Sequence, residues 1–415
     1  MSMADCGCDT TQPALMPFDE ALRFLLDQAR PLSETERLPL ERALGRVLAE
    51  SVRSRVDVPP WDNSAMDGYA INSRDLGHEP TLHVAQRIPA GVAGSELLPG
   101  TAARIFTGAP IPPGADAVVT QEVCEVLENQ VLIKQMPRPG ENIRRAGEDM
   151  LQGEEILPIG TRLSPQHLGL AASAGVAELS VYRRLRVAVF ASGDELVMPG
   201  GTLGAGQIYN ANQFTLGGLV ERLGCELIQL GMVEDSLEAT CDALGRGAEA
   251  ADLILTSGGV SVGEEDHVKP AVERLGRLDL WKIAVRPGKP IAFGQVHGTP
   301  FLGAPGNPVS MFVTFAIFAR PFILRMQGVS QDYLPMSMKA LAAFDKPPTD
   351  RRLEFARGRL ETDERGRALV RLYANPSSGV LRSVTWANGL AVLPPMTAIA
   401  QGDTIDFIPF SELLS

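Results

Sequence analysis

The sequence predicts a multidomain protein that combines an α/β domain with β-rich parts, the α/β domain being doubly wound around a mostly parallel sheet. Three observations predict this fold class. Short apolar runs alternate with helical segments between residues 184 and 330, which is the pattern of consecutive βαβ units. Residues 52–147 and 335–415 instead carry short β-like runs separated by turn signals. The chain has 415 residues, enough for several such domains.

The N-terminal part is predicted to lead from a tail through a helix into a β-rich domain. Residues 1–13 are polar, and we expect a flexible tail there. A helix follows from Pro17, because apolar residues recur at spacings of three and four. Residues 52–147 are interpreted as a small β-rich domain inserted within another domain. A second helix is predicted from Ser164, since a proline follows at the first helical position.

The α/β part alternates strands and helices along the chain. We predict strands at 186–190, 225–232, 252–256, 280–285, 291–293 and 301–302, and helices at 212–223, 237–246 and 306–326. The last helix contains the most apolar run, from Val309 to Ile323, which Arg320 and Pro321 interrupt. That run is too short to cross a bilayer, so we expect a buried helix. The C-terminal β part is predicted to be a small barrel or sandwich.

Composition excludes some classes of function. The net charge is −12, which argues against an extended basic face for nucleic acid. Five scattered cysteines, with only Cys6 and Cys8 close together, are typical of a reducing compartment. The N-terminus lacks a basic region followed by an apolar core. We therefore expect no signal peptide, no membrane association and a cytoplasmic location.

The segment from Leu253 to Asp266 is the most informative one. An apolar run leads directly into Ser257-Gly258-Gly259, and three acids follow from Glu264 to Asp266. Glycines let the backbone approach an anion at the carboxyl end of a strand. The acids would repel a bare phosphate, so they indicate a metal between carboxylate and phosphate. The alternative is an ordinary strand–helix turn with solvated acids.

Acids follow three predicted strands of the α/β part. Glu195, Asp235 and Asp266 each come shortly after a strand. If these strands are parallel, their carboxyl ends meet at one edge of the sheet, and the three carboxylates converge there. The alternative for each of them is solvated loop charge.

Basic residues lie near the same predicted edge. Lys282 falls on a predicted strand, and Arg286 and Lys289 fall in the turn after it. A crevice with carboxylates on one side and Lys or Arg on the other suits a metal-bridged phosphate, or an oxyanion beside a phosphate.

Several longer strings together carry a family resemblance. They are residues 62–70 (DNSAMDGYA), 107–110, 142–145 with 147–149, 192–196, 257–266, 286–290 and 305–310. In this order, over nearly the whole chain, the sequence resembles the molybdopterin molybdenumtransferase family, the MoeA proteins, and the matching domain of gephyrin.

The resemblance implies an elongated dimer of four-domain subunits. The α/β domain, of the molybdopterin-binding type, would comprise residues 14–33 and 182–334, and the linking domain 34–51 and 148–181. The inserted β domain would be 52–147, and the C-terminal β-barrel 335–415.

The resemblance also implies an activity in molybdenum cofactor biosynthesis. Such a transferase takes adenylylated molybdopterin and molybdate, hydrolyses the adenylate with a divalent cation, expected to be Mg²⁺, and releases AMP and molybdenum cofactor. The implied assembly is a homodimer with an intersubunit active site. The upstream molybdopterin adenylyltransferase is an implied partner.

The family's functional positions can be carried over residue by residue. The implied catalytic residues are Asp67, Thr107, Glu195, Asp235 and Asp266. Of these, Glu195, Asp235 and Asp266 are the implied metal ligands. Within the acid cluster from Glu264 to Asp266 we expect Asp266 to contact the metal, and Glu264 to be structural. The implied substrate-binding residues are Ser257, Gly258, Gly259, Ser261, Lys282, Arg286, Lys289, Pro305, Asn307, Arg357 and Ser378. Arg286 stands where many members carry Lys.

Three other functions remain open at this point. The adenylyltransferase of the preceding step shares the α/β domain but lacks the surrounding β domains, which residues 60–70 and 335–415 argue against. A non-catalytic scaffold like gephyrin would come with fused domains and long linkers. A tungsten-inserting paralogue stays open, because tungstate and molybdate have nearly the same size and charge.

Overall fold

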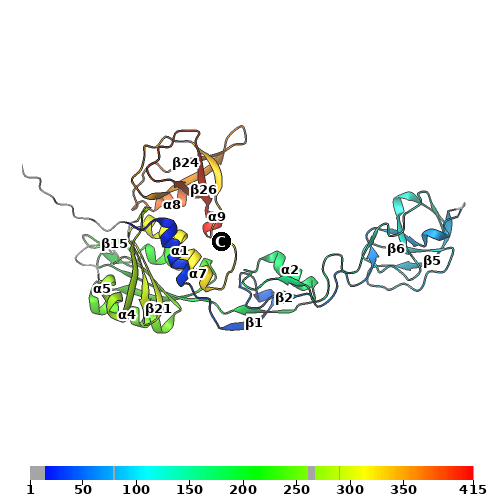
Figure 1. The fold of residues 1–415 in the computed structure, drawn as a ribbon, viewed down its shortest axis with the longest axis horizontal. Helices are drawn as coiled ribbons and strands as arrows, with labels where there is room; N and C mark the ends of the chain where they lie inside the picture. The colour runs from blue at the N-terminus through cyan, green and yellow to red at the C-terminus, as the bar shows by residue number, and fades with distance from the viewer. Residues whose placement is uncertain (1–14, 78–79, 260–266, 289, 415) are drawn as a thin grey trace, which may run out of the picture. The chain divides into compact units, whose positions relative to one another are not determined.

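The computed structural model describes residues 15–77, 80–259, 267–288 and 290–414 (Figure 1). The chain divides into two compact units. One comprises Met1–Glu36 together with Tyr182–Ser415, and the other comprises Arg37–Val181.

The first unit contains a six-stranded sheet. Its order is β16 (Glu226–Val233), β13 (Arg186–Ser192), β17 (Leu253–Ser257), β21 (Thr299–Ala304), β20 (Pro290–Val296) and β18 (Gly276–Lys282). The first four strands run parallel, whereas β20 is antiparallel to both β21 and β18. Burial of β13 and β17 explains their continuous apolar sequences. The predicted mostly parallel sheet is confirmed.

Helices cover both faces of this sheet (Figure 1). On one face lie α4 (Leu237–Ala250) and α5 (Val268–Leu275), and on the other α1 (Phe18–Gln28), α3 (Asn212–Arg222) and α7 (Arg320–Met326). Neighbouring strand residues point to opposite faces. Ala292 packs into the core that α4 and α5 share, whereas Phe293 contacts Phe24 of α1 and Phe322 of α7. The arrangement is therefore doubly wound, as predicted.

The predicted last helix is one long element with a local irregularity. It consists of α6 (Pro308–Thr314), a π-helical turn η4 (Phe315–Ala319) and α7. Pro321 has no N–H, and its ring would clash with the carbonyl of Ile317 in a regular α-helix. The π turn widens the helix at this point, so the helix continues through the proline. Residues 308–326 are long and apolar enough to cross a membrane, but 94% of the most apolar stretch is buried inside the protein.

The C-terminal part of the first unit is a closed five-stranded barrel. The strands are β22 (Met338–Ala342), β23 (Leu353–Thr362), β24 (Ala368–Leu372), β25 (Gly389–Leu393) and β26 (Thr404–Pro409), and β23 pairs with β25 to close the ring. Two short helices, α8 (Arg382–Trp386) and α9 (Phe410–Leu413), accompany it. Of the two predicted alternatives, barrel and sandwich, the barrel is correct.

One predicted strand is wrong. Residues 280–285 do not form one strand, because β18 ends at Lys282 and β19 (Val285–Arg286) leaves the α/β sheet. β19 runs parallel to β23 of the barrel. Arg286 therefore lies in a short strand paired with the barrel, and not in a turn.

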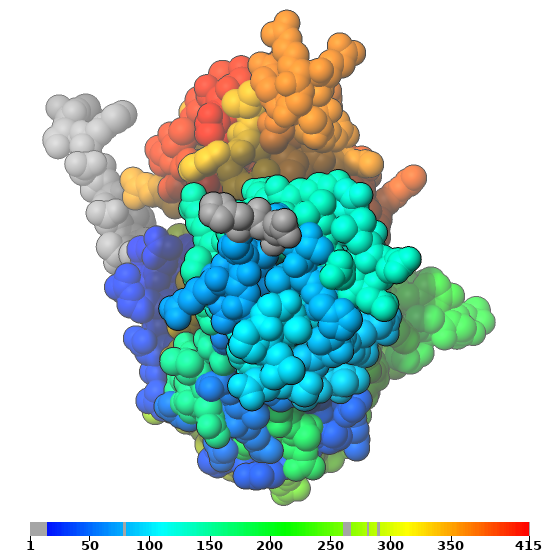
Figure 2. Space-filling model, turned by 90° about the vertical axis from the view of Figure 1, so that its right-hand side faces the viewer, coloured from blue at the N-terminus to red at the C-terminus, as the bar shows by residue number. Residues whose placement is uncertain are grey.

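The second unit contains a six-stranded β domain. Its order is β7 (Ala117–Thr120), β4 (Gly68–Ile71), β6 (Thr101–Ile105), β5 (Thr81–Ile88), β9 (Gln130–Ile133) and β8 (Cys124–Leu127). Apolar clusters around Val119 and Val118 lie on its two faces, because successive residues of β7 point to opposite sides. Figure 2 shows one surface of this domain in blue and cyan.

Shorter elements complete the two units. The second unit also contains the pairs β2 (Val52–Arg53) with β11 (Glu155–Leu157) and β3 (Asn63–Ser64) with β10 (Ile143–Arg144), together with α2 (Pro165–Ser173) and the 3-10 helices η1 (Leu40–Arg42), η2 (Ser73–Asp75) and η3 (Gln121–Val123). The pair of β1 (Thr35–Pro39) and β12 (Glu178–Tyr182) includes the residues at which the division into two units falls. In the first unit, β14 (Leu196–Val197) and β15 (Ile208–Tyr209) form a parallel pair between β13 and α3.

Candidate active site

A cavity of about 850 Å³ opens at the carboxyl ends of the parallel strands, where an α/β sheet places its ligand sites. Its walls come from the segments that follow β13, β16, β17 and β21, from β15, and from a loop of the barrel. The lining residues are 191–193, 195, 196, 208–212, 235, 257–259, 288, 305–308, 310, 352, 378 and 379. This set includes the sequence-predicted residues Glu195, Asp235, Ser257, Gly258, Gly259, Pro305, Asn307 and Ser378.

The glycine turn after β17 has a conformation that requires glycine. Gly258 and Gly259 have φ values of +96° and +65°, which residues with a side chain rarely adopt. A Cβ on Gly258 would also lie 2.7 Å from the carbonyl oxygen of Ser192. The N–H of Gly258 donates to the carbonyl of Ala304 at 3.1 Å. The turn is therefore packed against the ends of both neighbouring strands.

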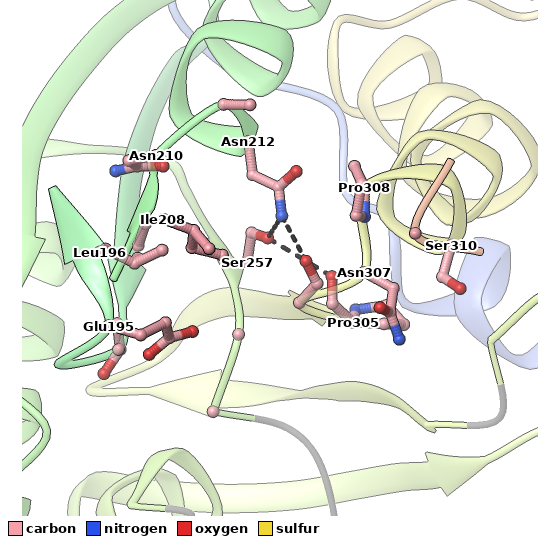
Figure 3. Close-up of a pocket in the computed structure, with 18 of the residues that line it drawn as sticks. Glu195, Leu196, Ile208, Asn210, Asn212, Ser257, Pro305, Asn307, Pro308 and Ser310 are labelled. Carbon is pink, nitrogen blue, oxygen red and sulfur yellow. Dashed lines mark hydrogen bonds between the residues drawn. The ribbon is translucent and has the colours of Figure 1, made fainter. Parts of the chain in front are cut away.

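Two of the predicted carboxylates meet at this cavity. Glu195 follows β13 and Asp235 follows the adjacent parallel strand β16. The Asp235 backbone N–H donates to Asp194 Oδ1 at 3.2 Å, and the Ser192 hydroxyl donates to Asp235 Oδ1 at 3.4 Å. Figure 3 shows Glu195 extending toward the glycine turn.

The third predicted carboxylate, Asp266, and the predicted substrate-binding residue Ser261 lie outside the described residues. Within the described part of the chain, no three His, Cys, Asp or Glu side chains are grouped closely enough to hold a metal ion. Glu195 and Asp235 are therefore the two predicted metal ligands that the described residues bring to this cavity.

Asn212, at the start of α3, was not predicted as a site residue. Its Nδ2 donates to Ser257 Oγ and to the carbonyl of Gly306, both at 2.7 Å (Figure 3). Ser257 Oγ in turn donates to the carbonyl of Pro305 at 3.4 Å. Sequence patterns mark Asn212 only as a helix start, because its partners lie 45 and 94 residues further along the chain.

A smaller cavity of about 420 Å³ lies beside the barrel. It is lined by Arg286, Pro287, Gly288, Arg352, Asn375, Pro376, Ser377 and Ser378. Gly288, Arg352 and Ser378 line both cavities, so the two are neighbours. Arg352, a second residue that sequence reasoning missed, pairs with the Asp350 carboxylate and lowers the pKa of Asp350 to about 2.

Arg357 supports the loop of the barrel and faces neither cavity. Its side chain is buried, with 4% of the residue exposed. The guanidinium donates to the carbonyls of Asn375 and Ser377, both at 3.1 Å, and to the Ser383 hydroxyl at 3.0 Å. Beyond these residues, the carbonyl of Ser378 accepts the N–H of Val309 at 3.0 Å. Arg357 thus holds the loop that carries Ser378, where the sequence predicted substrate contact.

The predicted basic wall is only partly assembled. Arg286 lines the smaller cavity, whereas Glu195 and Asp235 line the larger one. The predicted crevice, with acids and bases facing each other in one cavity, is therefore not formed by these three residues. Lys282 is exposed at the end of the edge strand β18 and lines neither cavity. Lys289 lies outside the described residues.

Asp67 and Thr107 lie in the second unit and contact each other. Asp67 Oδ1 accepts hydrogen bonds from the backbone N–H and the hydroxyl of Thr107, both at 2.8 Å. These two bonds hold the pKa of Asp67 below its usual value.

Three family models match the chain in sequence order. They are the MoeA N-terminal region (domain I and II) over residues 16–175, a probable molybdopterin binding domain over 188–325, and the MoeA C-terminal region (domain IV) over 339–410. With the carboxylate-lined cavity in the middle domain, they define a transferase of molybdenum cofactor biosynthesis.

Relatives extend the match to the full chain. A molybdopterin molybdenumtransferase of Haemophilus influenzae is 40% identical, covering 96% of this chain and all of that protein. One from Nostoc is 36% identical over 93% of this chain and 91% of that protein. The crystal structure of a molybdopterin biosynthesis MoeA protein from Pyrococcus horikoshii is 30% identical, with a TM-score of 0.83 over 95% of this chain and all of that one. The chain belongs to the MoeA family.

Proposed function

We propose that this chain inserts molybdate into adenylylated molybdopterin and releases AMP and molybdenum cofactor. The observation that carries this proposal is the pair of adjoining cavities, one lined by Glu195 and Asp235 and the other by Arg286. The larger is big enough for a nucleotide-linked substrate. The smaller suits a tetrahedral oxyanion, because an arginine offers several N–H donors to such a group.

Mg²⁺ is the proposed cofactor, and the donor set fits it. Mg²⁺ prefers oxygen ligands and is usually held by one or two carboxylates together with water and substrate phosphate. Glu195 and Asp235 supply two carboxylates at one cavity, and the partners described for the Asp235 side chain are limited to one long hydrogen bond from Ser192. Asp266 is the proposed third ligand. Bound there, the ion would neutralise phosphate charge during hydrolysis.

The chain's own residues would bind and orient the two substrates. The glycine turn lets the protein backbone come close to the phosphates of the substrate. Arg286 and Ser378 would hold molybdate beside them, and Lys282 and Lys289 would add positive charge near the same edge. Water adds to the adenylyl phosphorus, the phosphoanhydride bond breaks, and AMP leaves while the pterin keeps its own phosphate.

Asp67 and Thr107 are proposed to complete the site from a second copy of the chain. The two hydrogen bonds from Thr107 favour the ionised form of the Asp67 carboxylate and lower its pKa, which suits a role beside a cation or an attacking water. The proposed assembly is thus a homodimer with an intersubunit active site. The proposed location is the cytoplasm, and the molybdopterin adenylyltransferase that makes the substrate is a proposed partner.

An insertion assay tests this function. Purified chain is given adenylylated molybdopterin, Mg²⁺, and either molybdate or tungstate, and the release of AMP and active cofactor is measured. We expect release with molybdate and its loss in Asp266→Ala and Asp67→Ala, while Asp242→Ala on the exposed side of α4 behaves as wild type. Undiminished release in both site variants would reject the assignment. Preference for tungstate would identify a tungsten-inserting enzyme, and no release with either oxyanion would favour a scaffold.

A further inference from the structure

We propose that Asn212 is a positioning residue that fixes the width of the larger cavity and thereby the placement of the adenylylated substrate. This inference rests on the proposed function. Asn212 would act through Ser257 and Gly306, without forming or breaking a bond itself.

The amide NH2 group of Asn212 donates to two different turns. One N–H is available for Ser257 Oγ at the end of β17, and the other for the carbonyl of Gly306 after β21, with both distances 2.7 Å (Figure 3). A planar amide with two short hydrogen bonds holds its partners at a fixed spacing. Asn212 therefore acts as a brace between these turns.

The hydroxyl of Ser257 belongs to the same brace. Ser257 is 2% exposed, and its Oγ accepts from Asn212 and donates to the carbonyl of Pro305. A hydroxyl has one hydrogen to donate, and the Ser257 hydroxyl donates it to the carbonyl oxygen of Pro305. Ser257 thus contributes to the site by linking Asn212 to the turn after β21, and it has no second hydrogen for a substrate oxygen.

The brace joins turns that already lie against each other. Gly258 donates to Ala304 at 3.1 Å, and a Cβ on Gly306 would lie 3.6 Å from the Cα of Gly258. Asn212 also ties these turns to the segment before α3, where Ile208 and Tyr209 line the cavity. Three walls of the larger cavity are therefore connected through one side chain.

Loss of the brace should affect one substrate more than the other. In Asn212→Ala, Ser257 and Gly306 lose their common partner, and the two turns can separate. Misplacement of a bound substrate by about 1 Å can lower a rate about 100-fold. We expect kcat/KM for adenylylated molybdopterin to fall about 10- to 100-fold, mainly through a higher KM. The KM for molybdate should stay unchanged, because the brace does not touch the residues that line only the smaller cavity.

Three variants separate positioning from simple space filling. Asn212→Asp keeps the shape but has no N–H donor, so we expect it to be impaired at least as much as Asn212→Ala. Ser257→Ala should be milder, because the bond to Gly306 remains. When Ser257→Ala is added to Asn212→Ala, kcat/KM for adenylylated molybdopterin should fall by less than about a further 2-fold, because the effects of residues in one hydrogen-bond network are not additive. Glu221→Ala, exposed on the same helix, is the control and should match wild type.

Hydrogen exchange gives a readout that does not depend on activity. In Asn212→Ala, the amides of residues 253–259, Ala304, Gly306 and Asn307 should exchange faster than in wild type and in Glu221→Ala. The midpoint of thermal unfolding should change little. Unchanged exchange, or an Asn212→Asp variant with wild-type KM and kcat, would overturn the inference. Absence of AMP release by the wild-type chain would instead reject the proposed function, while faster exchange would still support the brace.

Discussion

Asp67 accepts two hydrogen bonds from Thr107 through a single carboxylate oxygen, one from the backbone N–H and one from the hydroxyl, each 2.8 Å long. Both bonds favour the ionised form and lower the pKa of Asp67. Because the pKa of Asp67 is lower in the folded protein, its ionised carboxylate stabilises the fold at pH values above the ordinary pKa of an aspartate. That contribution is lost as the pH falls through the lowered pKa.

Replacement of Thr107 should therefore change the titration of Asp67. Thr107→Val keeps the backbone N–H and removes the hydroxyl, so the pKa of Asp67 should rise partway toward its ordinary value. Thr107→Ser keeps both donors and should leave the pKa at the wild-type value. The measurement is the pH dependence of the carboxyl signal of Asp67 in protein labelled with ¹³C-aspartate. A Thr107→Val protein that titrates as wild type would show that the hydroxyl bond is absent in solution.

A second prediction concerns the ion pair at the start of β17. Asp252 binds Arg183 through two hydrogen bonds of 2.6 and 2.8 Å, and Arg186 also contacts it. Burial alone would raise the pKa of Asp252, but the hydrogen bonds from Arg183 and Arg186 outweigh it and lower the pKa to about 2. Asp252→Asn should cost about 2–3 kcal/mol of unfolding free energy at pH 7.

The pH dependence of this cost has a definite sign. Stabilisation by a carboxylate with a lowered pKa is complete above its ordinary value of 3.8 and declines toward pH 2. The difference between wild type and Asp252→Asn should shrink over that window in denaturant unfolding. Glu273→Gln removes the exposed pair with Lys269 and should cost less than about 0.5 kcal/mol. An equal cost for both variants would contradict the assignment.

A third prediction follows from the burial of Arg357. Arg357→Lys cannot reproduce the bonds to Asn375, Ser377 and Ser383, because lysine lacks the forked donors. We expect a loss of about 2–4 kcal/mol in stability and, since the loop carries Ser378, a KM for molybdate raised about 10-fold. Arg359→Lys, at an exposed position of the same strand, is the matched control. A raised KM without any loss of stability would instead indicate direct substrate contact by Arg357.

A fourth prediction tests the smaller cavity. Arg286→Gln removes the positive charge and should raise the KM for molybdate about 10- to 100-fold, measured from initial rates of AMP release. Arg286→Lys keeps the charge and should fall between this variant and wild type. Arg277→Gln, an exposed arginine on β18 paired with Asp279, should have no effect. An unchanged KM in Arg286→Gln would place the oxyanion elsewhere.

Sequence patterns predicted the meeting of Glu195 and Asp235 because parallel strands place the residues that follow them at one edge. They did not reveal Asn212, because its hydrogen-bond partners are distant in sequence. They did not reveal Arg352 either, because only the fold shows that it lines both cavities. Arg357 matched a family position, but no pattern states which way a guanidinium points.

The mistaken strand at 280–285 has a similar cause. Its apolar residues serve two sheets, since Lys282 ends β18 and Val285 begins the pairing with the barrel. Both sheets require the same residue types there, so periodicity cannot locate the break between them. The change between βα and purely β patterns, in contrast, extends over many residues, so the sequence indicates the fold class of each part more readily than such a local break.

We expect the cavity lined by Glu195 and Asp235 to hydrolyse the adenylate during molybdenum insertion. The most direct measurement is single-turnover AMP release with adenylylated molybdopterin, molybdate and Mg²⁺. We predict one AMP per molybdenum cofactor for the wild type and for Glu238→Gln, an exposed control on α4. Glu195→Gln and Asp235→Asn should release AMP at least about 100-fold more slowly while keeping wild-type unfolding midpoints. Wild-type release of AMP by both carboxylate variants would contradict the account.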